Sequence, residues 1–272
     1  MMLYVFFEKK ILRMLKKIIH FIDYLNVGAF PIVAKDFCNF EKNNMYDMKK
    51  TLILIFEGDL SLTRFGDGEI DHCIYPHKDT QWQIASYKLS TYLDEILLNK
   101  DEKILTCIPG LNSYERWWKR YWINHWFVFK NKLDLNKMYG NSLITRPEFF
   151  LTYKDLGVEL WKKNWNNREV IFITGENSRF QFNHILFDNI KNYDVFYSKN
   201  RNAFDDVDRI INNVNNEYNK NKIFIIALGQ AGTILSYKLH ILGFRALDVG
   251  HIDRSYDNVF LSGKIPEKIK FD

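Results

Sequence analysis

Two carboxylates lie one residue apart in the segment Arg64-Phe-Gly-Asp-Gly-Glu69, where Gly66 and Gly68 flank Asp67. Glycines on both sides let the backbone adopt positive φ and approach a ligand closely, so a turn or extended conformation is expected. In that conformation residues i and i+2 project to the same side, and Asp67 and Glu69 would face one point. Such a pair suits Mn²⁺ or Mg²⁺ when a substrate phosphate completes the coordination shell. A polar turn that faces water is the alternative, because Asp-Gly turns are common.

A second group of ionisable residues is Asp248-Val-Gly-His-Ile-Asp253, which follows an apolar run. His251 is a candidate general base, metal ligand or phosphate contact, and Asp253 is a candidate base or a group that orients the histidine. A structural role is the commoner one for a lone histidine, but here the neighbouring acids favour a site.

A glycine turn, Gly229-Gln230-Ala-Gly-Thr233, stands between an expected strand and an expected helix. Free amides at a helix start can cradle a phosphate. Asp248 stands about where the ribose-binding acid of an NAD enzyme would lie, although the third glycine of the dinucleotide fingerprint is missing. An NAD-dependent oxidoreductase is therefore an alternative reading, which leaves the Asp-Gly-Glu segment without a role.

The second half of the chain alternates apolar strand-like runs with helical patterns. Strands are expected at residues 169–174, 193–197, 222–228 and 243–249, with helices at 180–190 and 205–216 and a third that follows the turn 229–233 and ends at residue 242. This alternation predicts an α/β, Rossmann-like, mainly parallel sheet with helices on both faces and ligands at the carboxyl ends of the strands. Earlier, residues 103–108 read as a strand, whereas the apolar run 51–56 fits either a strand or a buried helix.

Residues 1–45 are expected to form a leader that precedes one large domain over residues 46–272. Within residues 8–25, apolar side chains recur at helical spacing opposite lysines and arginines, which predicts a basic amphipathic helix. Such a helix either lies on an anionic membrane surface or packs on its own domain or on a second subunit, as in a homodimer. Residues 27–44 read as a connector because they combine glycine, proline and scattered polar residues.

Charge and cysteine content limit the classes of function. The first 50 residues hold nine Lys/Arg against five Asp/Glu, so most of the net charge of +5 lies there and the body is nearly neutral. A nucleic-acid binder would show a basic face on its folded part. Three scattered cysteines favour reduced thiols in the cytoplasm, and no apolar stretch is long enough to span a bilayer. We therefore expect a cytoplasmic protein, peripheral at the inner face of the membrane if the leader binds lipid.

Aromatic residues are dense between positions 114 and 127. Rings can form a stacking floor for a sugar, but packing of a bulky helix is the commoner reason for this spacing. Near position 146, a turn and short strand end in Arg146, which can fork onto a phosphate or pair with a surface acid.

Taken together, the motifs resemble the GT-D family of bacterial glycosyltransferases, over about residues 46–262 and in the family's order. The residues that carry the resemblance are Arg64–Glu69, Gln81, Ile144–Pro147, Gly175-Glu176 with Ser178-Arg179, Asn202–Phe204, Ala227–Gly229 and Asp248–Asp253. The chain departs from the family pattern after Arg179, where His184 replaces an expected acid.

The resemblance implies a Rossmann-like fold, a nucleotide-diphosphate-sugar donor such as UDP-glucose, and a divalent metal held by an Asp-x-Glu motif. Asp67 and Glu69 match that motif. The reaction expected is transfer of a hexose to a glycan or lipid-linked glycan acceptor in surface polysaccharide or glycoprotein synthesis. The expected donor-binding residues are Arg64, Gly66, Gly68, Gln81, Arg146, Glu176, Arg179, Gly229, Gln230, Thr233 and Asp248, with His251 or Asp253 as the acceptor base. A non-catalytic, membrane-associated partner in glycan assembly is the remaining alternative.

Overall fold

The computed structural model describes residues 30–111, 116–182 and 184–263, without the side chains of residues 116 and 215–217. The amphipathic helix expected over residues 8–25 lies outside these ranges. Contacts divide the chain into two compact units: unit 1 comprises Met1–Lys42 and Leu111–Asn131, and unit 2 comprises Asn43–Gly110 and Lys132–Asp272.

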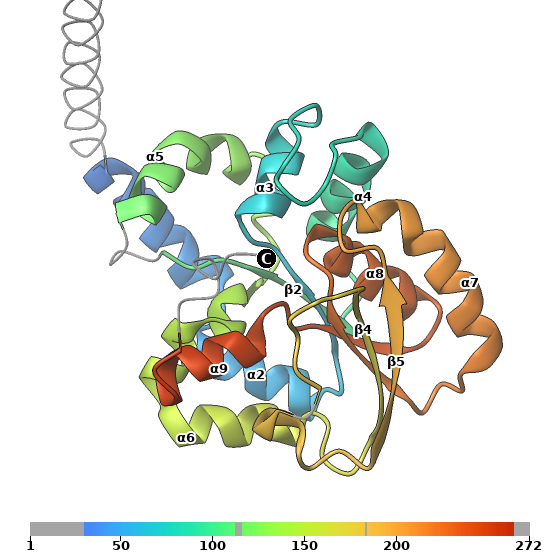
Figure 1. Cartoon of the computed structure of the whole chain (residues 1–272). Helices are drawn as coiled ribbons and strands as arrows, with labels where there is room; N and C mark the ends of the chain where they lie inside the picture. The colour runs from blue at the N-terminus through green and yellow to red at the C-terminus, as the bar shows by residue number, and fades with distance from the viewer. Residues whose placement is uncertain (1–29, 112–115, 183, 264–272) are drawn as a thin grey trace, which may run out of the picture. The chain divides into compact units, whose positions relative to one another are not determined.

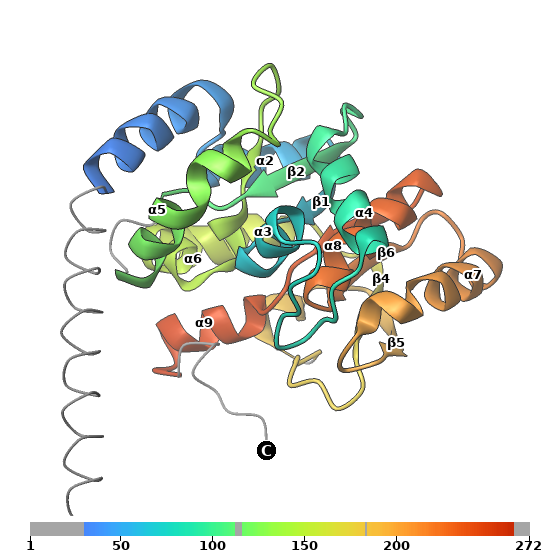
Figure 2. The same ribbon diagram turned by 90° about the horizontal axis from the view of Figure 1, so that it is seen from above.

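Unit 2 is built on a seven-stranded sheet with the order β3-β2-β1-β7-β6-β4-β5, in which every neighbouring pair is parallel. The strands are β1 (Ser61–Arg64), β2 (Ile104–Ile108), β3 (Gly140–Asn141), β4 (Glu169–Gly175), β5 (Asn192–Ser198), β6 (Ile223–Ala227) and β7 (Arg245–Asp248). Because all strands run the same way, their carboxyl ends share one edge of the sheet, which Figure 2 views from above. The predicted Rossmann-like sheet is confirmed.

Helices cover both faces of this sheet, as a parallel sheet requires. On one side lie α2 (Met48–Glu57), α6 (Pro147–Lys163) and α9 (Ile252–Phe260), and on the other α4 (Tyr87–Leu98), α7 (Val207–Glu217) and α8 (Gln230–Ile241) (Figure 1). Strand β4 shows the two-sided burial: Val170 and Phe172 enter one hydrophobic core, whereas Ile171 and Ile173 enter the other. Residues 51–56, ambiguous in sequence, belong to helix α2.

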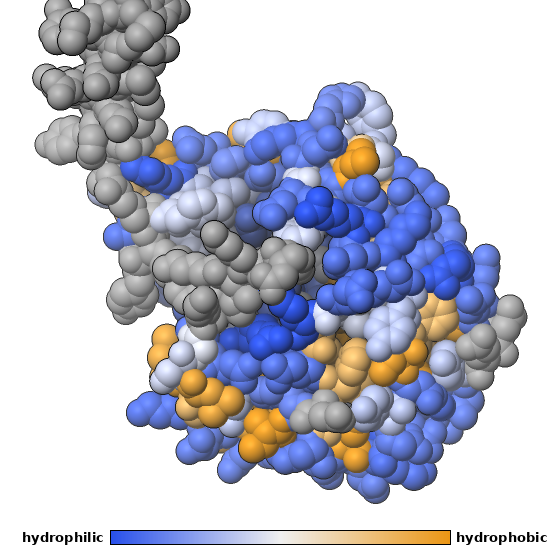
Figure 3. All heavy atoms as spheres, viewed as in Figure 1, coloured by the Kyte–Doolittle hydropathy of each residue, from blue (hydrophilic) through white to orange (hydrophobic). Residues whose placement is uncertain are grey.

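The link between β4 and β5 differs from the expected helix over residues 180–190. Its described part contains only a short 3-10 turn, Ile185–Phe187, because tertiary contacts take up backbone groups that a helix would pair. Trp165 Nε1 donates to the carbonyl of Leu186, and the amide of Gln181 donates to a buried carboxylate. One face of β5 is therefore covered lightly, and apolar side chains gather over this strand in Figure 3.

Unit 1 contains a helix over residues 30–44, which continues into unit 2, and α5 (Arg116–Lys130). Residues 27–44, expected to be a connector, are helical over their described part. The apolar side chains of this helix have a partner, because the Phe37 ring centroid lies 4.8 Å from that of Trp122 and 4.2 Å from that of Trp126. Core packing is thereby confirmed as the role of these two tryptophans.

At the amino edge of the sheet, one buried guanidinium joins three elements. Arg245, at the start of β7, donates to the carbonyl oxygens of Leu60, Ile55 and Asn164 and to Asn164 Oδ1, over 2.7–3.2 Å. Burial lowers its pKa to about 10. The side chain closes the ends of α2 and α6 onto the strand, because it donates to the carbonyls of Leu60 and Asn164 and shares the Ile55 carbonyl with the Leu60 amide.

We predict that Arg245→Met lowers the free energy of unfolding by about 2–4 kcal/mol, because several buried acceptors lose their donor. The measurement is the urea midpoint of unfolding. Arg168→Met is the matched control: Arg168 contacts the same Asp59 as Arg245, but its side chain is 46% exposed. That change should cost less than about 1 kcal/mol. Equal losses in the two variants would contradict the role given to Arg245.

Candidate functional site

The strands β1 and β7 lie side by side at the centre of the sheet, where the chain order changes direction. From β1 the chain proceeds to β2 and β3 on one side, whereas β7 is reached from β6 on the other side. In open α/β sheets this switch point, at the carboxyl ends of the strands, is where ligands bind. Arg64 ends β1 and Asp248 ends β7, so both stand at this point.

Arg64 and Asp248 form an ion pair that further groups hold in place, with Asp248 buried and Arg64 half-buried. Arg64 Nη2 lies 3.7 Å from Asp248 Oδ1. The Thr233 hydroxyl lies 2.8 Å from the Arg64 carbonyl oxygen and 3.1 Å from Asp248 Oδ2, and the Gly250 amide donates to Asp248 Oδ1. Gly250 has φ +51°, and a Cβ there would overlap Arg64 Nη2. Glycine at 250 therefore gives the guanidinium its room.

The Asp-Gly-Glu segment is not the expected turn. It forms the first turn of α3 (Asp67–Ile74), with extended Gly66 as the N-cap. Glu69 Oε2 accepts a hydrogen bond from the Gly66 amide at 2.7 Å, an arrangement that satisfies a helix-start donor and favours the helix. On a helix, residues i and i+2 diverge, so Asp67 is exposed while Glu69 is buried.

Glu69 and Asp248 are acids in a poorly solvated place. Burial raises the pKa of Glu69 to about 7, with the Asp248 charge adding to the rise and Arg64 opposing it. Burial also raises the pKa of Asp248, against the charge of Arg64 and the hydrogen bond from Thr233. Two carboxyl groups thus share one guanidinium, which leaves the buried cluster short of positive charge when both acids are ionised.

The start of α8 packs closely against the start of α3. A Cβ on Gly68 would overlap Gln230 Nε2, so a side chain at position 68 would displace the end of the Gln230 side chain. Gln230, the first residue of α8 after the N-cap Gly229, donates to Thr80 Oγ1. The first-turn amides of both helices therefore begin at the same edge, where a phosphate is favoured.

A strap of loop residues, 79–86, crosses from α3 toward the segment that follows β5. Gln83 is buried: its Oε1 accepts from the Phe204 amide, and its Nε2 donates to the Ile84 carbonyl. Asn202 Oδ1 accepts from the Ile84 amide. Gln81, expected at the donor site, is exposed on the same strap. The sequence predicted a role for Gln81 and none for Gln83, because the sequence alone does not show which of two nearby glutamines is buried.

Other expected donor contacts flank the central cluster. Arg146 follows β3 and is half-buried at the start of α6, while Glu176 is exposed and Arg179 half-buried after β4. The strands β3 and β4 are five steps apart in the sheet order, roughly 24 Å at ~4.8 Å per strand. These residues can contact separate parts of one elongated ligand, but not one atom.

The two candidate bases differ in access. His251, the N-cap of α9, is exposed. Asp253 is fully buried; its Oδ2 accepts from the Gln181 amide, and burial raises its pKa. Two further contacts fix the same loop to α9: Arg254 Nη2 donates to the Arg179 carbonyl, and His184 Nε2 lies 3.1 Å from Asp257 Oδ1.

The start of α3 offers two carboxylates, Asp67 and Glu69, as metal ligands. Across the described ranges, no three His, Cys, Asp or Glu side chains are grouped so that they could hold a metal ion. A cation at Asp67 and Glu69 would need further oxygens from a ligand or water, as Mg²⁺ and Mn²⁺ bound to substrate phosphates do. The donor set and its surplus of negative charge fit such an ion.

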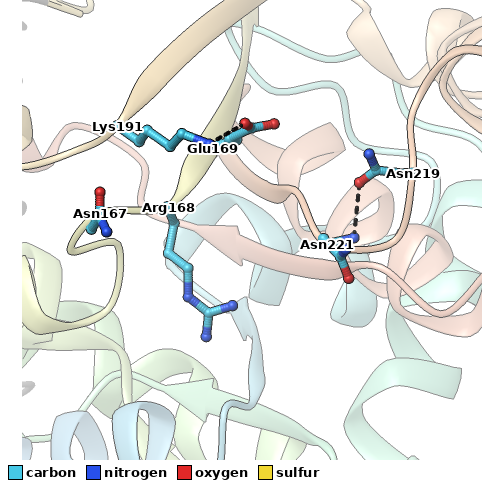
Figure 4. Close-up of a pocket in the computed structure, with 6 residues that line it drawn as sticks. All are labelled: Asn167, Arg168, Glu169, Lys191, Asn219 and Asn221. Atoms are coloured by element: carbon cyan, nitrogen blue, oxygen red, sulfur yellow. Dashed lines mark hydrogen bonds and ion pairs between the residues drawn. The ribbon is translucent and has the colours of Figure 1, made fainter.

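A separate hollow of about 360 Å³ lies at the opposite, amino edge of the sheet. It is lined by Asn167, Arg168, Glu169, Lys191, Asn219 and Asn221 (Figure 4). Lys191 there pairs with Glu169 at the first residue of β4. None of the expected site residues lines this hollow.

Solved structures with a similar fold include two of the domain of unknown function 1792. One, described as having a distinct glycosyltransferase fold, superposes with a TM-score of 0.76 at 24% identity and covers 88% of each chain. Another, described as a new glycosyltransferase from Streptococcus sanguinis, gives a TM-score of 0.71 at 27% identity over 84% of this chain and 88% of its own.

Two curated streptococcal proteins also resemble the chain. The glycosyltransferase GlyD of Streptococcus pneumoniae is 28% identical over 238 residues, and the probable glycosyl transferase Gly of Streptococcus gordonii is 26% identical over 226. These matches cover 82% and 79% of this chain but only 28% and 33% of the relatives, so the chain spans about a third of their length or less.

The family model described as "Glycosyltransferase GT-D fold" matches residues 62–272, from β1 to the end of the chain. The matched region contains both the switch-point cluster and the Asp-Gly-Glu helix start. The chain therefore belongs to the family of glycosyltransferases with the GT-D fold.

Proposed function

We propose that this glycosyltransferase moves a hexose from a nucleotide-diphosphate sugar, such as UDP-glucose, to a glycan or lipid-linked glycan acceptor, with a divalent metal at the diphosphate. The observation that carries the proposal is the meeting of Arg64, Glu69 and Asp248 with the starts of α3 and α8 at the switch point. A cation, an arginine and two helix starts together would favour a diphosphate.

Asp67 and Glu69 would hold Mn²⁺ or Mg²⁺. A bound cation supplies charge that stabilises the diphosphate as it leaves the sugar. Glu69 is held by the Gly66 amide and faces the charge of Arg64, whereas Asp67 lies at the surface of the same helix turn.

Arg64 would bind the diphosphate through its guanidinium, which Asp248 and Gly250 orient. The amides that follow Gly229 would take further phosphate oxygens. Arg146 and the pair Glu176 and Arg179, on either side of this centre, would contact the remaining parts of the donor or the acceptor. The strap of residues 79–86, which the hydrogen bonds of Gln83 hold in place, would support these donor-binding residues.

His251 is the better candidate for the group that takes the proton of the acceptor hydroxyl. Its ring is exposed beside the switch point, as a base that meets an incoming sugar must be. Asp253 is enclosed and already accepts from Gln181, so it would act by positioning the loop after β4.

An NAD-dependent oxidoreductase has less support. Its ribose-binding acid would be Asp248, but that carboxylate is engaged by Arg64, Thr233 and the Gly250 amide within the protein. The non-catalytic alternative makes a different prediction, since it expects binding of the sugar nucleotide without turnover.

We predict that Asp67→Asn and Glu69→Gln each lower metal-dependent turnover of the nucleotide sugar by about a hundredfold, because the diphosphate loses its cation. A mass-spectrometric screen of nucleotide sugars, with and without Mn²⁺, identifies the donor and gives the rates. Asp71→Asn is the control on the same helix, where Asp71 pairs with Lys78. Turnover that needs no metal and is unchanged in both variants would reject the metal role.

Gly250→Ala should reduce donor binding roughly tenfold, because a Cβ at this position displaces the Arg64 guanidinium. Gly243→Ala is the matched control, since Gly243 also has positive φ but a Cβ there meets nothing within 4 Å. Both changes should cost about 1–2 kcal/mol of stability from backbone strain. Calorimetric titration of the donor separates them, and equal affinities would refute the orienting role of Gly250.

His251→Ala should lower kcat by about a hundredfold or more, as expected for loss of a general base. Asp253→Asn keeps an oxygen that can accept from the Gln181 amide but removes the basic group, and it should retain most of the turnover. Steady-state rates with the donor identified above check both. The reverse pattern would assign the proton transfer to Asp253.

A further inference from the structure

The positive charge of the chain is concentrated in unit 1. Residues 1–42 and 111–131 hold eleven Lys/Arg and five Asp/Glu, a balance of +6, whereas the rest of the chain holds 27 and 28, a balance of −1. The unit that does not contain the sheet therefore accounts for the whole net charge of +5. A region of concentrated positive charge attracts anionic partners, so unit 1 is suited to bind one.

Both acids in the described part of unit 1 are engaged within the unit. Asp36 accepts from Trp126 Nε1 at 2.7 Å and pairs with Lys130 Nζ at 2.8 Å, which lowers its pKa. Glu41 accepts from the Leu111 amide at 2.7 Å. Lys35 and Lys42, in contrast, are exposed, so the charge that this part of the unit presents to its surroundings is positive.

Helix α5 adds an apolar surface to this charge. Trp117 and Val128, eleven residues apart and so on one stripe of the helix, are 51% and 50% exposed, and Phe127 beside them is 48% exposed. The sequence of α5 contains Arg116, Lys119, Arg120 and Lys130 and no acid. Its inward face is occupied by Trp122 and Trp126 against Phe37, so the exposed aromatics are additional to that core.

We infer that the outward stripe of α5, Trp117, Phe127 and Val128, is a docking surface for an anionic lipid bilayer. Exposed tryptophan and phenylalanine insert at the level of lipid headgroups, and the surrounding lysines and arginines are attracted to acidic lipids. Residues 1–42, most of the leader, belong to this unit and are basic in sequence. The inference goes beyond glycosyl transfer, because it assigns a second surface with a separate ligand.

The test uses the full chain and sedimentation with vesicles of phosphatidylcholine containing about 30% phosphatidylglycerol, compared with pure phosphatidylcholine. We expect binding to the anionic vesicles only, weakened by added salt. Trp117→Ser combined with Phe127→Ser should lower the partition constant roughly tenfold or more. The control is Leu156→Ser combined with Ile241→Ser, two exposed apolar residues of unit 2, which should bind as wild type does.

Brominated lipids quench the fluorescence of tryptophans that touch the bilayer, so they show which part of the chain contacts the membrane. Trp122, Trp126, Trp161 and Trp165 are fully buried and Trp82 and Trp118 are half-buried, so Trp117, which is 51% exposed, should contribute most to quenching of tryptophan fluorescence. Trp117→Phe should keep vesicle binding and lose most of the quenching.

Unchanged binding of the double variant, or no binding of wild type to anionic vesicles, would overturn the inference. So would concentration-dependent dimerisation that the double variant abolishes, since this would make the stripe an interface between copies. Donor turnover without vesicles should be equal in all these variants, so failure here is distinct from failure of the proposed transferase activity.

Discussion

The arrangement at the carboxyl edge depends on one guanidinium shared between two buried carboxyl groups. Arg64 holds β1 to β7 through Asp248, and its charge opposes the rise in the pKa of Glu69 at the start of α3. Isolated, any of these three charges would be costly to bury, and together they still leave a surplus of negative charge. The cluster therefore supports the central strands and also carries more negative than positive charge when both acids are ionised.

The opposite edge of the sheet is constructed in a different way. There Arg245 is buried among carbonyl oxygens, and its role is to close helix ends onto β7. Both arginines lie at the ends of the central strands β1 and β7, one at each edge. At the amino edge each guanidinium nitrogen of Arg245 has an acceptor, whereas at the carboxyl edge the negative charge exceeds the positive charge when both acids are ionised. The amino edge therefore contributes to stability, and the carboxyl edge is suited to bind a ligand.

Sequence patterns predicted the sheet well because buried parallel strands are continuous apolar runs, as in β4 and β6. They also predicted that Thr233 and Asp248 come after such strands and so share an edge, whereas the short strand β1, which ends at Arg64, was not predicted. The conformation of Asp67 to Glu69 was mispredicted, because two glycines suggested a turn while the Glu69 carboxylate caps a helix. Gln83 and Gly250 were missed, since their roles arise from contacts with residues distant in the sequence, Phe204 and Arg64.

The placement of α5 in the chain has a consequence for how this enzyme can diversify. The helix belongs to the crossover between β2 and β3, and the pairing of those strands is fixed by Cys107 beside Gly140 and Ile108 beside Asn141. The Met45 to Tyr139 bridge adds a further constraint just before β3. Crossover residues between these anchors can be lengthened, shortened or exchanged without shifting strand register. Related chains could thus carry different insertions between β2 and β3 on the same parallel sheet.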